Sequence, residues 1–313
     1  MINRTFENIK TNKATGFVPY IVAHYPNRDT FNEALNLLAE LNADVIEIGI
    51  PFTDPIAEGK IIESAHHHAL KHNFALDDIC QIVKEFKTYS DTPVIAMGYT
   101  NSFINPSSEQ IASKLSECGF NGVLIVDLPA SEKSIMNAFK DKQLNFVQLI
   151  APTTELSLIE DYLENDPALI YYITQRGITG SNNLNLVEIS EKLGEIKKLS
   201  NKPVVTGFGI KTVEDVENLK TLTDGIVIGS PIVEKISLDP SLTELKKYDE
   251  ITEVHRLTGT NSDYQITILS PSIDEYDHFQ QKLIKEIECT YMSSHISLQI
   301  IKKNHKLSLD YLN

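Results

Sequence analysis

The stretch DVIEIGIPFTDPIAEG, from Asp44 to Gly59, decides the fold and supplies the first candidate functional residues. Its first seven residues are mostly apolar and alternate poorly, which is typical of a strand buried on both faces in a parallel sheet. A carboxylate inside such a strand is costly unless it is paired or functional, so Glu47 needs an explanation. Either Glu47 carries chemistry, or it is a strand-end acid bonded to a neighbouring hydroxyl. A loop rich in Gly and Pro then delivers a second acid, Glu58.

Apolar segments of this kind alternate with amphipathic segments over the first three-quarters of the chain. About eight such pairs in roughly 240 residues are typical of a (β/α)8 barrel. A doubly wound open sheet is the alternative, but no Gly-x-Gly-x-x-Gly turn follows the first strand. We therefore predict an α/β fold, a TIM barrel over residues 1–240. Its expected strands are Phe17–Val22, Val45–Ile50, Pro93–Met97, Gly122–Val126, Phe146–Ile150, Leu169–Ile173, Pro203–Thr206 and Gly225–Ile228.

The pattern changes at Leu238–Tyr248, and residues 245–313 predict a small, partial ferredoxin-like α+β domain. A turn-like segment between two strand-like segments predicts a hairpin, and a helix and two short strands follow. The expected elements are strands Ile251–Leu257 and Asp263–Leu269, a helix over Ile273–Glu286, and strands His295–Ile301 and Lys306–Leu309.

Composition excludes several classes of protein. The 313 residues carry a formal net charge of -15, which argues against a nucleic-acid partner and against binding to a membrane surface. Cys80, Cys118 and Cys289 lack metal-ligand spacing and are expected to be reduced thiols in a cytoplasmic protein. No signal peptide or apolar run long enough to span a bilayer is found, so no membrane role is expected.

Active residues of a parallel barrel lie at the C-terminal ends of its strands. Glu47 and Glu58 belong to that end. So do Gly207–Gly209 after the seventh strand and Gly229-Ser230 after the eighth, where glycines and a helix N-terminus favour phosphate, with tight turns as the alternative. The polar loop 175–183 after the sixth strand is a candidate lid or an ordinary surface loop.

These features predict acid–base chemistry on a phosphorylated substrate. Two carboxylates in different environments suit proton transfers at carbon, and the sixth strand lacks the lysine that a Schiff-base aldolase often uses. His66–His68 and His72 suggest a metal site, but a site needs three or four converging ligands. We predict no metal, and a solvated helix face for these histidines.

The motif from Glu47 to Gly59 resembles the signature of the tryptophan synthase alpha chain family. Further motifs of that family follow in order, and the resemblance covers about residues 6–237. These motifs are Phe17–Tyr20, Tyr99–Asn101, Val126–Pro129, Gly177–Gly180, Gly207–Gly209 and Ile228–Ser230.

The resemblance implies retro-aldol cleavage of indole-3-glycerol phosphate to indole and glyceraldehyde 3-phosphate. Glu47 is then the general acid and base, and Glu58 takes the place of an aspartate that accepts a bond from the indole N–H. Tyr20, Met97 and Asp127 line the indole pocket, Tyr171 lies beside Glu47, Thr179 closes the lid onto Glu58, and Gly180, Gly209, Gly229 and Ser230 bind phosphate.

The resemblance also implies a protein partner. Pro51 and Asp54 are expected to contact a tryptophan synthase beta chain in an alpha2-beta2 heterotetramer. Pyridoxal phosphate is expected only in that beta chain, and no cofactor in this chain.

Four departures from the family pattern concern the site. Glu58 is one methylene longer than the usual aspartate, and misplacement by about 1 Å can cost roughly a hundredfold in rate. Lys60 replaces a usual proline. His24-Tyr25 stands where Gly-Asp is common, and Gln175-Arg176 changes the usual order near the lid.

The tail, about Leu245 to Leu312, resembles part of the effector-binding domain of Lrp/AsnC-type regulators, without its first strand or the DNA-binding helices. The resemblance makes Gly259 and Asp263 candidates for binding an amino acid between paired subunits. Two alternatives to a working lyase therefore stay open. The barrel can be a catalytically impaired scaffold for an amino-acid-sensing or assembly module, or the tail can be an inert fusion.

Overall fold

The computed structural model describes residues 1–71, 75–174, 185–237, 251–256, 264–268 and 278–283. The chain forms two compact units, Met1–Thr243 and Glu244–Asn313. In the described residues, no helix is both long and apolar enough to cross a membrane.

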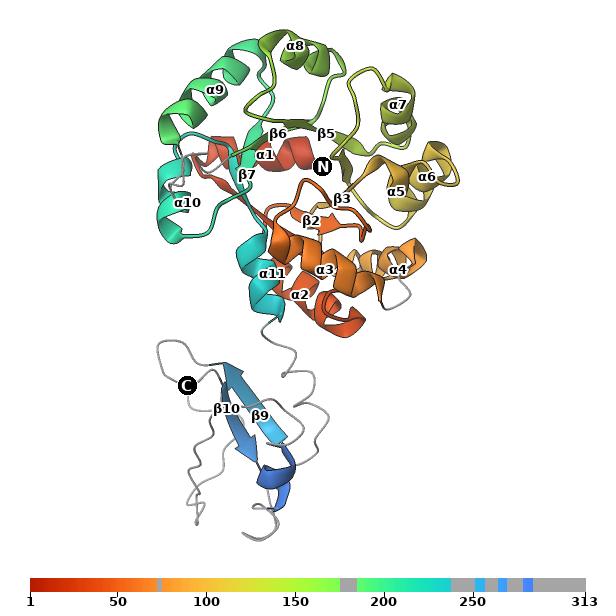
Figure 1. Cartoon of the computed structure of the whole chain (residues 1–313), viewed down its shortest axis with the longest axis vertical. Coiled ribbons are helices and arrows are strands. Elements are labelled where there is room, and N and C mark those ends of the chain that lie inside the picture. Colours follow the sequence, from red (N-terminus) through yellow and green to blue (C-terminus); the bar gives the residue numbers. More distant parts are fainter. Residues whose placement is uncertain (72–74, 175–184, 238–250, 257–263, 269–277, 284–313) are drawn as a thin grey trace, which may run out of the picture. The chain divides into compact units, whose positions relative to one another are not determined.

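The first unit is a closed barrel of eight parallel strands in sequence order, with β1 paired to both β2 and β8. Helices surround the strands (Figure 1). The predicted TIM barrel is therefore confirmed. The strands are β1 (Gly16–Val22), β2 (Ile46–Gly49), β3 (Val94–Gly98), β4 (Gly122–Ile125), β5 (Asn145–Ile150), β6 (Leu169–Ile173), β7 (Val204–Gly207) and β8 (Gly225–Ile228).

The helices of this unit follow the strands, except for one before β1 and extra helices after β2 and β3. They are α1 (Ile2–Thr11), α2 (Arg28–Glu40), α3 (Lys60–Leu70), α4 (Leu76–Phe86), α5 (Thr100–Phe103), α6 (Ser108–Glu117), α7 (Lys133–Asp141), α8 (Leu156–Glu164), α9 (Leu186–Leu199), α10 (Val213–Leu219) and α11 (Ser230–Ser237).

Alternation along each strand separates the barrel interior from the layer under the helices. In β2, Ile46 and Ile48 pack into the outer core, whereas Val45 belongs to the inner core with Tyr20 of β1. Because successive side chains of a strand point to opposite faces, Glu47 points inward with Val45. The inner core therefore contains the carboxyl group of Glu47.

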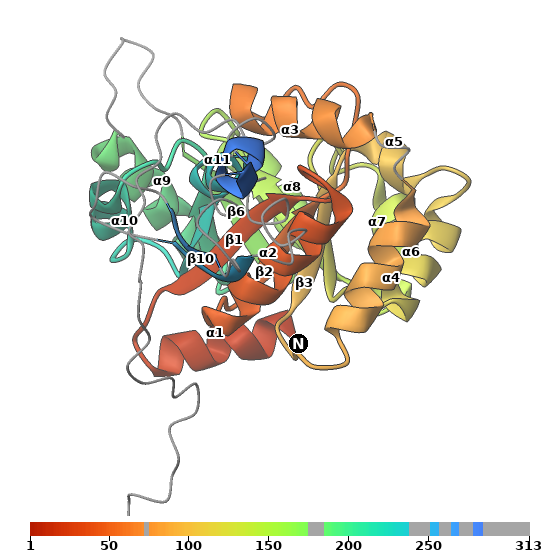
Figure 2. The ribbon, with the colours of Figure 1, turned by 90° about the horizontal axis from the view of Figure 1, so that it is seen from below.

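Helix α1 closes the N-terminal end of the barrel and was not predicted. Its buried residues Ile2, Phe6 and Ile9 recur at helical spacing. Gly16 and Gly122 make room for the helix, because a Cβ at either position would approach an isoleucine of α1 to 2.9 Å. Figure 2 shows α1 and α3 at opposite ends of the strands, so the mouth under α3 is the C-terminal end.

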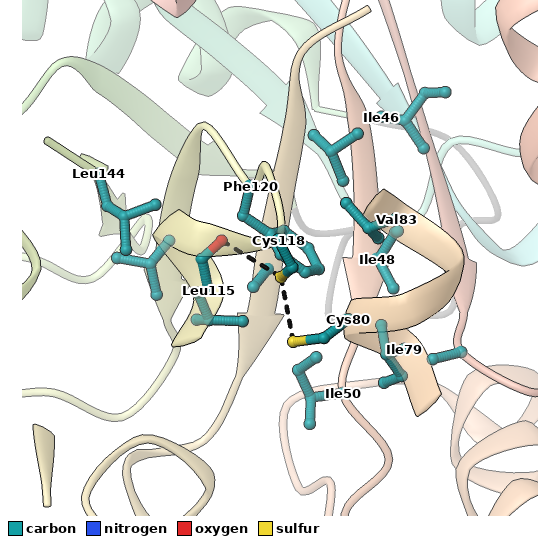
Figure 3. Packing of buried hydrophobic residues seen from close by; sticks show 14 of the residues in the cluster. Ile46, Ile48, Ile50, Ile79, Cys80, Val83, Leu115, Cys118, Phe120 and Leu144 are labelled. Atoms are coloured by element: carbon teal, nitrogen blue, oxygen red, sulfur yellow. Dashed lines mark hydrogen bonds between the residues drawn. The ribbon is translucent and has the colours of Figure 1, made fainter. Parts of the chain in front are cut away.

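The outer core contains two of the three cysteines. Cys80 of α4 and Cys118 at the end of α6 are free and buried, with their Sγ atoms 3.0 Å apart (Figure 3). The Cys118 thiol also contacts the carbonyl of Leu115 at 3.3 Å. Cys289 lies outside the described residues.

The described part of the second unit contains a hairpin and a helical segment. Strands β9 (Ile251–Arg256) and β10 (Tyr264–Ile268) pair antiparallel, as predicted for this hairpin. Residues 278–283 are helical, within the predicted helix. The two predicted C-terminal strands lie outside the described residues, so the partial α+β fold stays a prediction.

Candidate active site

Glu47 is fully buried inside the barrel, paired across the strands with Tyr20. Neither carboxyl oxygen has a hydrogen-bond partner in the described part of the chain. The bond to a neighbouring hydroxyl that the sequence left open is therefore not found there. Burial raises the pKa of Glu47 from 4.5 to about 8. At neutral pH this carboxyl is mostly protonated and can donate a proton.

Glu58 lies in the loop between β2 and α3, in a different environment. The hydroxyl of Tyr99, which directly follows β3, donates a hydrogen bond to Glu58 Oε2. The backbone N–H of Ala57 donates to the same hydroxyl at 3.0 Å. Burial raises the pKa of Glu58, and the bond from Tyr99 opposes that rise. The protein therefore holds two carboxyls whose environments separate their acidities.

Two buried tyrosines accompany Glu47 in the barrel interior. Tyr20 comes from β1 and Tyr171 from β6. Burial raises the pKa of both phenols, and the charges of Glu47 and Glu58 raise it further. Both tyrosines belong to the same buried cluster of the barrel interior, and Tyr20 is the cross-strand partner of Glu47.

Met97 lies in β3 and Asp127 lies just after β4, and the two residues differ in exposure. Met97 is buried in the inner core and is paired with Gly49. Asp127 is exposed and accepts hydrogen bonds from Thr100, at 2.7 Å from the backbone N–H and 2.8 Å from the hydroxyl. Asp127 thus fixes the start of α5, just after Tyr99. Its contact with an indole ring stays a prediction.

The candidate phosphate site lies after β7 and β8. Phe208 and Gly209 have positive φ angles of 71° and 68°, and for the bulky Phe208 this conformation is strained. Thr174 holds the turn, since its N–H and hydroxyl donate to the Gly207 carbonyl at 2.8 and 2.9 Å. Helix α11 begins at Ser230, next to the turn residue Gly229. A helix N-terminus and a strained glycine turn at adjacent strand ends suit an anion.

Several predicted site residues lie outside this cluster or outside the described residues. Pro51 is buried at the end of β2, and Asp54 is exposed in the following loop beside Ile56, which is 78% exposed. Thr179, Gly180, Gly259 and Asp263 lie outside the described residues. Their roles stay predictions.

The prediction of a solvated histidine face is wrong for His66, which is only 1% exposed. Ile62, Ala65, His66 and Ala69 form one buried stripe of α3, so the imidazole faces inward. Among the residues that the structure describes, no group of three His, Cys, Asp or Glu side chains could hold a metal ion. His72 lies outside the described residues.

The imidazole of His66 joins two parts of the site. Its Nε2 lies 3.0 Å from the Tyr20 hydroxyl, and its Nδ1 accepts the N–H of Phe52 at 3.1 Å. The neighbouring histidines have other partners: His67 contacts the Thr53 carbonyl at 3.0 Å, and His68 meets the Tyr25 ring edge-on at 5.5 Å.

Tyr99 was named only as part of a family motif and His66 only within a run of histidines, so sequence reasoning gave neither residue a role in the site. Tyr99 directly follows β3, so the rule that barrel sites gather at strand ends could have identified it. His66 lies four residues after Ile62 and three before Ala69, and this helical spacing could have shown that it is buried.

Comparison with known proteins yields two family matches. The family model described as tryptophan synthase alpha chain matches residues 6–261, and the model of the Lrp/AsnC ligand binding domain matches residues 234–307. The two matches overlap over residues 234–261.

Individual relatives agree with the first match. A tryptophan synthase alpha chain from Marinobacter nauticus is 35% identical over 238 residues, which is 75% of this chain and 88% of the relative. One from Nitrosomonas europaea is 32% identical over 266 residues, 84% of this chain and 97% of the relative. The solved tryptophan synthase subunit alpha from Legionella pneumophila is 30% identical with a TM-score of 0.71, covering 77% of this chain and 90% of that chain.

Proposed function

The chain belongs to the tryptophan synthase alpha chain family, and we propose that it cleaves indole-3-glycerol phosphate to indole and glyceraldehyde 3-phosphate. The observation that carries the proposal is the buried, unpartnered carboxyl of Glu47 inside the barrel mouth. A protonated acid at that position is what the first step needs.

Glu47 acts first as a general acid and then as a general base. Its carboxyl protonates C3 of the indole ring, and the resulting carboxylate then takes the proton of the glycerol hydroxyl next to that carbon. The bond between C3 and the glycerol carbon breaks, its electron pair restores the aromatic ring, and the hydroxyl carbon becomes an aldehyde. Glu47 ends protonated, so no external acid or base is consumed. Its raised pKa suits this alternation near neutral pH.

Glu58 accepts the hydrogen bond of the indole N–H and stabilises the positive charge that protonation at C3 creates. Tyr99 supports this role, because its hydrogen bond holds the longer glutamate side chain and favours the carboxylate form. Tyr20, Met97 and Tyr171 are the apolar and aromatic lining of the pocket. Gly209, Gly229 and Ser230 receive the phosphate.

The partner in this proposal is a tryptophan synthase beta chain, which carries the pyridoxal phosphate and uses the indole. The exposed loop that contains Asp54 and Ile56 supports a docking role for the residues after β2. An alpha2-beta2 assembly is the expected stoichiometry.

The test is steady-state release of indole from indole-3-glycerol phosphate, with and without a purified beta chain. We expect release that rises with the beta chain, and a loss of about a hundredfold or more in Glu47→Gln. Glu63→Gln, an exposed glutamate on α3, is the matched control and should retain full activity. Unchanged turnover in Glu47→Gln would overturn the assignment.

A second candidate function is supported by the Lrp/AsnC match over residues 234–307 and by the β9–β10 hairpin within it. In this proposal the C-terminal unit binds an amino acid or pairs with another copy, with Gly259 and Asp263 at the binding turn. Titration of the full chain with individual amino acids, followed by calorimetry and light scattering, tests it. Heat with one amino acid that disappears in Asp263→Ala would support sensing. No heat and no change in mass would leave the tail inert.

A further inference from the structure

The His66 imidazole hydrogen-bonds both to Tyr20 in the barrel interior and to the loop that leads to Glu58. Its partners are the Tyr20 hydroxyl at 3.0 Å and the Phe52 N–H at 3.1 Å. Both ring nitrogens are therefore engaged in a residue that is 1% exposed. A separate partner for each ring nitrogen indicates that His66 does more than fill space in the core.

The two contacts fix which ring nitrogen carries the proton. The Phe52 N–H can only donate, so Nδ1 must be the unprotonated acceptor. The proton of the neutral ring then lies on Nε2 and is donated to the Tyr20 oxygen. Burial lowers the pKa of His66 to about 4, which keeps the ring neutral at physiological pH.

The proton on Nε2 determines which hydrogen bonds the Tyr20 hydroxyl can make. Because its oxygen accepts a bond from His66, its own O–H proton is left to donate elsewhere. Tyr20 is paired with Glu47 across β1 and β2, and the phenol lies against Gly49 at the end of β2. The free O–H is therefore available at the barrel mouth, next to the candidate acid.

We propose that His66 is a positioning residue, which holds Tyr20 as a hydrogen-bond donor toward the reacting part of the substrate, an inference that rests on the proposed function. The same ring anchors Phe52, whose side chain stacks on Tyr99 with centroids 4.9 Å apart. Tyr99 in turn holds Glu58. One imidazole thus contacts Tyr20 on the Glu47 side of the site and, through the Phe52 backbone, the loop on the Glu58 side, and the proposal concerns its bond to Tyr20.

Two substitutions separate the two contacts. In His66→Asn the amide oxygen can replace Nδ1 and accept from Phe52, but nothing reaches Tyr20. In His66→Gln the amide nitrogen can replace Nε2 and donate to Tyr20, at the expense of the Phe52 contact. We expect kcat to fall about fivefold to tenfold in His66→Asn, the value of one lost hydrogen bond, with little change in KM. His66→Gln should stay within about twofold of the wild type, because it keeps the bond that matters.

Tyr20→Phe completes the test. If His66 acts through Tyr20, the double variant with His66→Asn should be no slower than Tyr20→Phe alone. His67→Asn and His67→Gln carry the same changes on the exposed neighbouring residue and should leave kcat unchanged. Melting temperatures of all variants show whether any loss reflects unfolding instead.

The ring itself provides a readout that needs no turnover. Proton–nitrogen correlation spectra of the imidazoles should show His66 protonated at Nε2 and bare at Nδ1, with the signal missing in His66→Gln. Three results would each overturn the proposal. They are a proton on Nδ1, an equal loss of kcat in His66→Asn and His66→Gln, and a double variant of His66→Asn with Tyr20→Phe whose loss of kcat is the product of the two single losses. A wild-type chain that releases no indole contradicts the proposed function, whereas the spectra still decide the arrangement of His66.

Discussion

The phenol of Tyr20 occupies the space that a side chain on Gly49 would need, and a Cβ atom on that glycine would overlap the phenol. Tyr171 stands in the same relation to Gly207. In each case the tyrosine comes from one strand and the glycine ends the next strand around the barrel. These glycines let two large aromatic side chains occupy the barrel interior beside Glu47.

Gly49→Ala should therefore disturb the site and the fold together. We expect a loss of about 1–3 kcal/mol in the free energy of unfolding, the usual cost of overpacking a core, and a large loss of indole release. Urea denaturation and the cleavage assay measure the two effects.

Gly194→Ala is the matched control. Gly194 lies in the exposed face of α9, and an added Cβ meets no atom within 4 Å. Alanine should stabilise this helix by up to about 1 kcal/mol. If Gly49→Ala proves as stable and active as Gly194→Ala, the close packing of Tyr20 is wrong.

Glu47 should make the protein less stable as the pH rises. Its pKa is about 8 in the folded protein and 4.5 without burial, so between these values the folded state keeps a proton that the unfolded state has released. The stabilisation is fully present below the unfolded pKa and is lost as the pH approaches the folded one. Relative to Glu47→Gln, the wild type should lose roughly 1.4 kcal/mol per pH unit in this window.

Guanidinium unfolding at several pH values between 5 and 8, on the wild type and Glu47→Gln, measures the difference directly. Other titrating groups are common to both proteins and cancel. Parallel stability curves for the two proteins would show that Glu47 is not held protonated by burial.

Tyr99→Phe should shift the acidic limb of the pH–rate profile to higher pH. The bond from Tyr99 holds the pKa of Glu58 below the value that burial alone would give, so its loss raises that pKa further. If cleavage needs the Glu58 carboxylate, kcat/KM of the variant should fall more at pH 6 than at pH 8.5.

Tyr89→Phe, at an exposed tyrosine that donates to Asn36, is the control and should leave the profile unchanged. A uniform loss at every pH would assign Tyr99 to packing alone.

The barrel could be predicted because its signal is repeated. The strands of the barrel are apolar runs, and Glu47 interrupts one of them. The sequence alone therefore indicates Glu47 as a candidate functional residue. Gly207–Gly209 and Gly229-Ser230 were identifiable for the same reason, since their places after the last two strands follow from the strand count alone.

The missed features depend on contacts between distant segments. Helix α1 was overlooked because Met1–Lys13 is polar overall, and only the spacing of Ile2, Phe6 and Ile9 reveals its buried face. His66 was assigned to a solvated helix face because the histidines lack the converging ligands that a metal site needs. Its spacing with Ile62 and Ala69 indicates burial, but its partners Tyr20 and the Phe52 N–H come from other segments and cannot be read from that spacing.

Ser230→Asp should weaken the binding of substrate without slowing the chemistry, if α11 begins at the phosphate site. A carboxylate at this first helical residue would lie close to the dianionic phosphate, and two like charges near 4 Å repel by about 1–4 kcal/mol in a partly solvated site. KM for indole-3-glycerol phosphate should therefore rise about tenfold or more, inhibition by inorganic phosphate should weaken in parallel, and kcat should change little. Ser108→Asp makes the same change at the first residue of α6, away from β7 and β8, and should alter neither constant. An unchanged KM in Ser230→Asp, or an equal rise in Ser108→Asp, would remove α11 from the phosphate site.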